Sequence, residues 1–516
     1  MTRSRRRCVL IASAGLLYPA VSTAQANGEA CRELTQQLSQ RGMALPREAR
    51  LVAACPEQKQ LRRFSRADGP WELLARAGLS KRSVAPLHAS RISMATLYNS
   101  ERPATAELPG VWAGRGVTFV ASAGAWGRVG PFSYAARPMV FWTENRAYTP
   151  SRSRLPIGFQ NPWFPAVIDA PYRSGPTAYG RADAGESFAR LDIFRFAAGV
   201  SNVAQSWGPA QLHPLVLGKQ TGFPHLFLES ALPLNVGIGA ISGRWIMGRL
   251  SATSFAPVHS NGKRRVLVGT VGVFSPRGIE GLELGGARLF TFYESVGGFT
   301  ISNSLLPLTG LHKTRSRQDF ESNQIASLFA RLALPSAPVD VYGEYFRDDH
   351  NTDLRDLIGE PDHTAAWVLG MSWRRHDTVR DRISALTIER VNSRATHLRR
   401  LRQQLPSYTH HQIVEGHAHR GLILGSPSLP GGGALSVVFD RRNRLSGWSI
   451  IAEAVHDAQG PAEGATWLGR PAGHYTIGFL REQKWKNRWY TVDARLQPGF
   501  GDVPGTNLRL TFGLDA

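Results

Sequence analysis

The sequence predicts an all-β fold: a large antiparallel β-barrel of the outer-membrane type with about 16–18 strands, preceded by a small N-terminal α-helical periplasmic region. Three observations predict it. The chain starts with an export signal, apolar residues recur at every second position over roughly 400 residues, and no long apolar run follows the signal. The 516 residues are 42% apolar, a composition that argues against extensive disorder and favours a folded chain with a large buried core.

The first 26 residues have the pattern of a secretory signal peptide. Basic residues precede an apolar run over about residues 8–20, and Ala24-Gln25-Ala26 supplies small residues for cleavage. We expect ordinary Sec export, because twin-arginine signals usually carry a bulky apolar residue where Cys8 stands. Removal of residues 1–26 takes away four arginines and no acids, so the mature chain stays strongly basic.

Residues 27–105 are predicted to form the helical periplasmic region. Cys31 and Cys55 lie on two short stretches with helical spacing, and the turn-like residues 41–46 lie between them. Antiparallel packing of these helices would bring the two cysteines together, and an oxidising compartment favours a disulfide. The alternative is two unpaired buried thiols.

Residues 106–516 are predicted to form the transmembrane barrel. Trp367, Leu369, Met371 and Trp373 alternate with small or polar residues, and residues 507–514 repeat the pattern. Such strands suit either a soluble sandwich or a closed barrel with an apolar outer face. Export and the number of strands favour the barrel. Tryptophan and tyrosine near strand ends suit the two interfacial girdles, although ordinary aromatic packing is the alternative reading; they include Trp142, Trp163, Trp245, Trp485, Trp489 and Tyr490.

Arginine is dense between residues 373 and 402. If this tract lies at a barrel mouth, its guanidinium groups would attract an acidic glycan and grip its carboxylates. The candidate binding residues are Arg374, Arg375, Arg380, Arg382, Arg399, Arg400 and Arg402. The alternative is that these side chains face a polar lumen or lipid phosphates.

Two tryptophans are further candidates for polysaccharide binding, because sugar rings stack on aromatic faces. Trp163 follows Asn161-Pro162, and Trp207 lies beside amide and hydroxyl groups. The alternative is that Gly208-Pro209 makes a turn and Trp207 packs inside the barrel as a plug.

Acids and histidines form a third group of candidates. Glu344, Asp348 and Asp349, with His363 further on, could be read as a metal site or as an acid and base pair. We favour ion pairs with lumen arginines that fix a plug or an extracellular loop. His417 and His419 can point to one side of a strand, but no third zinc ligand is placed, so no metal is predicted.

Several blocks, in order along residues 110–440, resemble the Wzi-type capsule-assembly proteins. They are residues 199–227, 342–350, 360–363, 388–390, 408–410 and 416–426. The residues of this chain that carry the resemblance are Trp207, Gly208, Pro209, Phe223, Pro224, Glu344, Asp349, His363, Tyr408, His410, Gly416, His417, Arg420 and Gly421. The resemblance implies an 18-stranded outer-membrane barrel with a helical periplasmic bundle that acts as a lectin, without catalysis.

The predicted function is therefore a lectin of the cell outer membrane that binds surface or secreted, acidic polysaccharide and aids capsule or exopolysaccharide assembly or attachment. The expected partners are polysaccharide, outer-membrane lipid and polysaccharide export machinery, with no cofactor. Export removes the chain from nucleic acid. The sequence has no G-x-S-x-G, H-E-x-x-H or Walker motif, and we expect no enzymatic activity. Two alternatives stay open, an anion-selective porin and an outer-membrane glycan hydrolase or deacetylase.

Overall fold

The computed structural model describes residues 87–105, 108–148, 168–171, 173–256, 264–309, 322–334, 337–348, 358–394, 406–410, 412–456, 472–501, 503 and 505–516. The expected signal peptide, most of the expected helical region and the Cys31–Cys55 pair lie outside these residues, as does Trp163. Within the described ranges, no helix is both long and apolar enough to cross a membrane.

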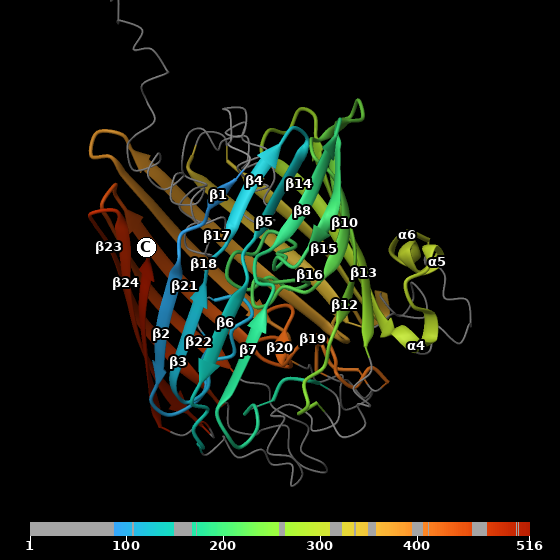
Figure 1. The fold of residues 1–516 in the computed structure, drawn as a ribbon. Coiled ribbons are helices and arrows are strands. Elements are labelled where there is room, and N and C mark those ends of the chain that lie inside the picture. The colour runs from blue at the N-terminus through green and yellow to red at the C-terminus, as the bar shows by residue number, and fades with distance from the viewer. Residues whose placement is uncertain are drawn as a thin grey trace, which may run out of the picture.

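Of the described strands, β19 (Ala418–His419) and β20 (Leu422–Ile423) form a separate two-stranded sheet, and the other 23 form one antiparallel sheet that closes on itself (Figure 1). Its first nine strands are β1 (His88–Ala89), β2 (Ser93–Asn99), β3 (Gly116–Ser122), β4 (Ala125–Val129), β5 (Phe132–Ala136), β6 (Met139–Thr143), β7 (Tyr179–Asp183), β8 (Phe188–Ile193) and β9 (Phe196–Ser201). The middle strands are β10 (His225–Ser230), β11 (Leu234–Asn235), β12 (Gly239–Leu250), β13 (Arg265–Pro276), β14 (Leu282–Tyr293), β15 (Ser322–Ala333), β16 (Val339–Asp348), β17 (Ala365–Asp377) and β18 (Arg382–Asn392). The last are β21 (Gly433–Arg442), β22 (Ser446–His456), β23 (Gly473–Trp485), β24 (Arg488–Phe500) and β25 (Thr506–Asp515).

Five pairs of consecutive strands lie end to end, namely β1 with β2, β3 with β4, β5 with β6, β7 with β8 and β10 with β11. Counting each such pair as one span, the 23 described strands make 18 spans around the ring. The ring closes where β2 pairs with β25, from Ser93 opposite Asp515 to Asn99 opposite Arg509. The predicted all-β barrel of about 16–18 strands is confirmed.

The barrel begins earlier than predicted. Residues 93–99 are a strand of the ring, so the boundary of the helical region at residue 105 is wrong. This strand is only seven residues long, and it places Ala95 and Leu97 inward and Met94 and Tyr98 outward. An alternation of seven residues shortly before Pro103 is too short to predict a strand from sequence. The position of this strand in the ring is set by its pairing with β25, which is at the other end of the chain.

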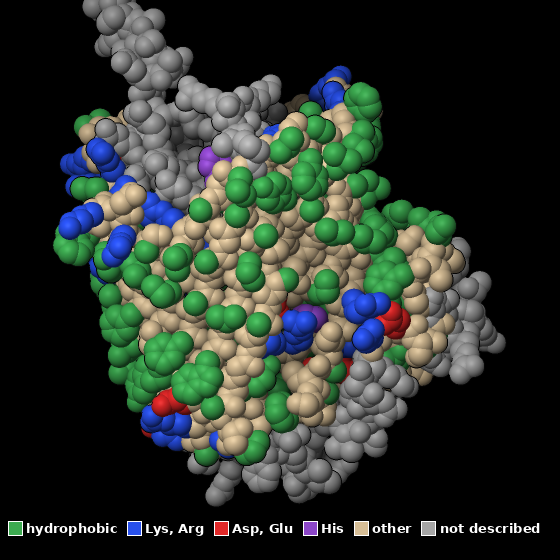
Figure 2. Space-filling model, in the orientation of Figure 1, with side chains coloured by type: hydrophobic (Ala, Val, Ile, Leu, Met, Phe, Trp, Pro, Cys, Tyr) green, Lys and Arg blue, Asp and Glu red, His purple; other side chains and the backbone are tan. Residues whose placement is uncertain are grey.

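The two faces of the sheet differ as the alternation predicts. Outward side chains such as Leu369 and Ile477 are 59% and 65% exposed, whereas the inward Ser372 and Thr476 are buried. Figure 2 shows hydrophobic side chains spread over the outer wall. Because the outer face of this single closed sheet is apolar and uncovered over most strands, the soluble sandwich does not fit.

The predicted aromatic girdles are found in part. Trp142 and Trp485 are exposed near opposite ends of the wall. Trp489 does not belong to a girdle, because it is buried on the inward face, where the Arg442 guanidinium stacks 4.2 Å from its ring centre. The alternation explains this difference, since Trp489 is one residue out of step with its exposed neighbour Arg488.

The two ends of the barrel differ in the length of their connections. Short turns, such as 194–195, 277–281, 378–381, 443–445 and 486–487, lie at the end where β25 finishes, which is the upper end in Figure 1. At the opposite end, consecutive strands are separated in sequence by more residues, such as 202–224, 251–264, 349–364 and 393–432. We call these the short-turn end and the long-loop end.

Three short helices lie outside the ring: α4 (Glu294–Gly297), α5 (Ile301–Ser304) and α6 (Leu306–Thr309) (Figure 1). They cover outward residues of β12 to β14 that would otherwise be exposed, including Met247, Val266 and Phe292. The Trp245 indole on β12 donates a hydrogen bond to the Ser304 carbonyl at 2.7 Å, which ties the helices to the wall.

Candidate functional site

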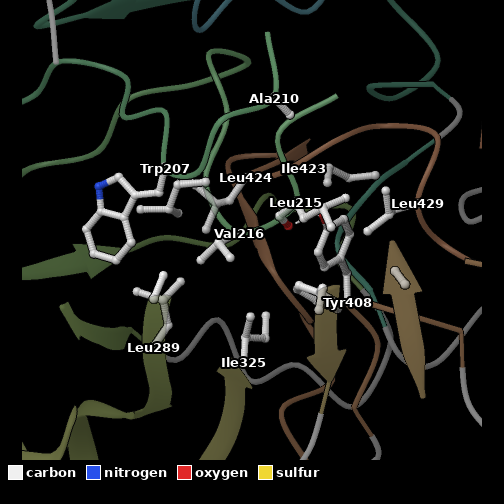
Figure 3. Packing of buried hydrophobic residues seen from close by; sticks show 14 of the residues in the cluster. Trp207, Ala210, Leu215, Val216, Leu289, Ile325, Tyr408, Ile423, Leu424 and Leu429 are labelled. Carbon is white, nitrogen blue, oxygen red and sulfur yellow. Dashed lines mark hydrogen bonds between the residues drawn. The ribbon is translucent and has the colours of Figure 1, made fainter. Parts of the chain in front are cut away.

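The lumen is filled by segments of the chain itself. Residues 203–224 and 406–432 fold inward from the long-loop end and pack together against the wall (Figure 3). We call these two segments the plug. Its apolar contacts join Trp207, Leu215, Val216, Leu217, Tyr408, Ile423, Leu424 and Leu429 to inward residues of the wall such as Ile246, Leu267, Leu289, Ile325 and Phe346.

Trp207 is a fully buried member of the plug. Its backbone N–H donates to the Leu217 carbonyl at 3.1 Å. Gly208 follows with φ +89°, and a Cβ added there would lie 2.3 Å from Oε2 of Glu344 on β16. The hypothesis that Trp207 stacks on a sugar is wrong for this conformation, because burial leaves no ring face for a ligand. The packing alternative is the one the structure supports. Pro209 and Phe223 are buried beside it, while Pro224 is exposed at the start of β10.

Tyr408 and His417 clip the two plug segments together. The Tyr408 hydroxyl donates to the Leu215 carbonyl and accepts from the Ser426 N–H at 3.2 Å. The His417 Nε2 lies 2.7 Å from the Val216 carbonyl oxygen, and its backbone N–H donates to the Tyr408 carbonyl. Burial lowers the pKa of His417 to about 4, so the ring is neutral at ordinary pH and Nε2 acts as a donor.

The acids of β16 and β18 hold the plug, though not as predicted. Glu389 accepts hydrogen bonds from the backbone N–H groups of Leu212 and His213, both at 2.9 Å, and from the Tyr342 hydroxyl. Asp348 accepts from the Tyr408 N–H. For Asp348 the expected partners were lumen arginines, whereas this contact is with a backbone donor of the plug; the sequence made no prediction for the partners of Glu389. The backbone N–H groups of an irregular segment have no partner in a helix or sheet, and one carboxylate can accept hydrogen bonds from several of them at once. If the carboxylate were paired with arginine instead, those N–H groups would lack a partner.

Glu344 and Asp348 both face inward, as an extended strand requires. The plug covers Glu344, which leaves no room for a substrate between the two acids. Asp349 lies outside the described residues, and the buried His363 donates its N–H to the Glu360 carbonyl within its own turn. Within the described ranges, no three His, Cys, Asp or Glu side chains are arranged to hold a metal ion.

The histidines of the plug cap backbone groups. His410 Nδ1 accepts from the N–H groups of Gln412 and Ile413, and His419 Nδ1 accepts from the Ser251 N–H at 3.0 Å. Their lone pairs are therefore used within the chain. Gly416 has φ +60° where the chain turns into β19 (Ala418–His419).

Arg420 and Gly421 form the two-residue turn between β19 and β20 (Leu422–Ile423). Both have positive φ, as a tight hairpin with this twist requires. The Arg420 guanidinium reaches Asp183 on β7 at 2.5 Å, so this small hairpin is tied to the wall. The family-motif residues that the structure describes thus gather in and around the plug.

The arginine tract does not form one patch, which corrects the prediction. Arg374 faces the lumen and pairs with Asp340, whereas Arg375 is on the outer face. Arg380 and Arg382 lie at the short-turn end, at the same end as the C-terminus. Side chains alternate between the two faces of a strand, so neighbouring arginines face opposite sides of the wall. The turn at 378–381 then reverses the direction of the chain. Arg399, Arg400 and Arg402 lie outside the described residues; the chain leaves the wall toward them at Arg394, at the long-loop end.

Charged networks line the lumen toward the short-turn end. Arg331 contacts Glu283 at 3.1 Å and Asp340 at 2.9 Å, and Asp340 also pairs with Arg374. Similar pairs are Arg244 with Glu229 and Arg442 with Glu482. Arg331 and Asp340 are close in sequence and belong to one hairpin. Arg244 and Glu229 are 15 residues apart and Arg442 and Glu482 are 40 apart, so only the strand order of the folded sheet reveals these pairs.

At the long-loop end, an outward-facing cluster combines arginine with aromatic rings. The His456 ring centre lies 5.5 Å from that of Phe500, and Tyr475 lies 5.0 Å from Phe500. Arg390 and Arg394, at the end of β18, are close enough to act electrostatically on His456. We call Arg390, Arg394, His456, Tyr475 and Phe500 the long-loop cluster. Sequence reasoning missed it, because its members lie on four strands.

The fold and the filled lumen define a class of protein: a closed antiparallel β-barrel of the outer-membrane type whose bore is occupied by its own inward-folded connections. The chain shares this fold with Wzi of Escherichia coli, a carbohydrate-binding β-barrel of the outer membrane involved in group 1 capsule assembly. The two chains have a TM-score of 0.57 and 13% sequence identity, over 94% of this chain and 97% of that one. The Wzi-type resemblance is thus confirmed at the level of the fold.

Outer-membrane proteins of the Occ group are also similar, but less so. OccK5 (OpdH) of Pseudomonas aeruginosa gives a TM-score of 0.39 at 8% identity, over 83% of this chain and 98% of that one. OccAB2 of Acinetobacter baumannii gives 0.40 at 9% identity, over 83% and 97%. No protein-family model and no curated protein matches the sequence.

Proposed function

We propose that this protein is an outer-membrane β-barrel lectin that binds acidic surface or secreted polysaccharide and aids its assembly, attachment or export, without catalysis. The observation that carries the proposal is the plug. A lumen packed with Trp207, Leu215 and Tyr408 favours a protein that binds at its ends over one that conducts solutes. The fold shared with a carbohydrate-binding barrel supports the same proposal.

The long-loop cluster is the proposed binding site. Short turns face the periplasm and long loops face outward in bacterial outer-membrane barrels, so this end would meet polysaccharide outside the cell. The exposed Tyr475 ring and the half-exposed Phe500 ring offer faces for sugar stacking, and Arg394 is exposed to receive a carboxylate. Arg399, Arg400 and Arg402 follow Arg394 in sequence and are proposed to extend the basic surface.

Glycan binding by paired variants tests the site. An array of acidic and neutral polysaccharides is applied to purified protein in detergent, and positive glycans are titrated at low and high salt. We expect Arg394→Ala combined with Tyr475→Ala to weaken binding at least ~tenfold, because a charge-assisted contact and a stacking contact are lost together. Raised salt should weaken binding to the unmodified protein more than to the variant.

The matched control is Arg380→Ala combined with Trp485→Ala, which removes the same chemistry from the short-turn end. This control should bind glycan as the unmodified protein does. Equal loss in both variants would contradict the site, and no binding to any acidic glycan would contradict the lectin. Shortened or deacetylated glycan recovered after incubation would contradict the absence of catalysis.

A further inference from the structure

Three arginines form a row on the outer wall near the short-turn end. The strand registers place Arg375 opposite Ser384, Ser384 opposite Arg441, Arg441 opposite Trp448, and Trp448 opposite Arg481. The row therefore runs straight across β17, β18, β21, β22 and β23. Adjacent strands are about 4.8 Å apart, so successive arginines in the row are separated by roughly 10 Å.

The row faces away from the lumen. Arg374 next to Arg375, Arg442 next to Arg441 and Glu482 next to Arg481 are all buried on the inward face. Since side chains alternate along a strand, the three row arginines point outward, and Arg375 and Arg481 are exposed. Arg481 also donates to Gln483 at 3.1 Å along its own strand, which leaves its guanidinium on the outer surface.

The row marks where the apolar wall ends. On β23, the exposed Ile477 and Phe479 come directly before Arg481 on the same face. On β17, Met371 and Trp373 come before Arg375 in the same way. Trp448 stands between two of the arginines, as tryptophan does at a membrane interface.

The turns beyond the row are also rich in basic side chains. Basic residues at this end with exposed or half-exposed side chains are Arg195, Arg277, Arg380, Arg382, Arg444, Lys484, Lys486 and Arg488. In the turns that the structure describes there, the comparable acids are Asp192, Glu280, Asp377 and Asp381. The tips also carry apolar side chains, with Phe194 98% and Val379 93% exposed. Figure 2 shows Lys and Arg gathered near the upper edges of the barrel.

We propose that the row binds the phosphate headgroups of anionic phospholipids in the leaflet at the short-turn end. This inference rests on the outer-membrane placement in the proposed function. Planar guanidinium groups bind phosphate in bidentate pairs, and the row lies at the edge of the apolar belt nearest the short-turn end, which is the level of the headgroups. Apolar turn tips beside basic residues suit the same interface, since their side chains enter the headgroup layer while the charges meet phosphate.

The test measures lipid retained by the full processed chain. The protein is reconstituted in nanodiscs of phosphatidylcholine with or without phosphatidylglycerol, and the lipid that stays bound after release into mild detergent is quantified by native mass spectrometry. We expect the unmodified barrel to keep phosphatidylglycerol in preference to phosphatidylcholine. The triple variant Arg375→Gln, Arg441→Gln, Arg481→Gln should keep at least ~tenfold less of it.

The matched control changes three arginines at the long-loop end that are not part of the long-loop cluster: Arg115→Gln, Arg146→Gln and Arg264→Gln. It loses the same net charge and should keep phosphatidylglycerol at the unmodified level. Heat-modifiable migration on gels shows that each variant is folded. Equal retention in the unmodified protein and in the row variant overturns the inference, as does loss of acidic glycan binding in the row variant alone, which would make the occupant a glycan.

These outcomes separate the inference from the proposed function. If the barrel inserts in nanodiscs but shows no preference for the anionic lipid, only the inference that the row binds anionic phospholipid is contradicted. A chain that stays in solution without detergent or nanodiscs contradicts the membrane placement itself.

Discussion

Single residues decide whether the plug can stay in the lumen. Gly208 has a positive φ and also approaches the Glu344 carboxylate so closely that a methyl group would collide with it. Glycine is therefore favoured at position 208 for two reasons: the backbone conformation has a positive φ, and there is no room for a Cβ.

Gly208→Ala should destabilise the plug by about 1–3 kcal/mol, because it adds backbone strain and a clash with a buried side chain. Hydrogen exchange of residues 203–224 measures the effect. The matched control is Gly278→Ala, at φ +91° with nothing within 4 Å of an added Cβ. The control carries the strain alone, and its effect is measured by the exchange of its own turn, residues 277–281. A similar loss of protection in both segments would mean that the contact with Glu344 contributes nothing.

The plug is the element whose position the sequence could not reveal. Alternating residues such as those of 367–373 indicate strands, because one face of each strand must be apolar. Plug residues have no such period, so for Trp207 the sequence offered both sugar stacking and packing inside the barrel and gave no contact partner for either. Its place follows from contacts with Leu289 and other wall residues that are distant in sequence.

The positions of the charged side chains also could not be predicted from the sequence alone. Sequence reasoning counted the arginines of 373–402 as one group, but the alternation divides Arg374 from Arg375, and the hairpin takes Arg380 and Arg382 to the short-turn end. The number of strands and their class were predictable from local pattern. The contacts of Asp340 and Glu389 were not, because strand pairing brings Asp340 to Arg331 and Arg374, and the inward-folded plug brings the N–H groups of Leu212 and His213 to Glu389.

Acidification should loosen the plug. The folded-state pKa of His417, about 4, is below its ordinary value of 6.5, and burial also lowers the pKa of His419. An opened plug would therefore bind protons between these pH values that the closed plug does not. Its stability is fully present above about pH 6.5 and declines as the pH falls toward 4.

Hydrogen exchange of residues 406–410 and 412–432 across this pH range measures the effect, after correction for the intrinsic pH dependence of exchange. His417→Gln keeps a donor for the Val216 carbonyl but cannot titrate, so its exchange should depend less on pH. Identical pH profiles for this variant and the unmodified protein would exclude His417 as the cause.

The whole molecule has two chemically different ends, with the plug packed in the lumen between them. Arginine and aromatic rings gather at the long-loop end, and a basic row with apolar turn tips surrounds the short-turn end. Because the plug separates the ends, variants at one end should leave binding at the other unchanged. Glycan and lipid binding should therefore be lost independently.

Conductance across a planar bilayer tests the central claim, that the barrel binds with a closed lumen and does not transport. The unmodified protein is compared with a variant in which residues 205–221 are replaced by a short Gly-Ser linker. We predict almost no current from the unmodified protein and steady current from the variant, whose conduction also shows that the barrel inserts. Steady current of similar size from both would contradict the account.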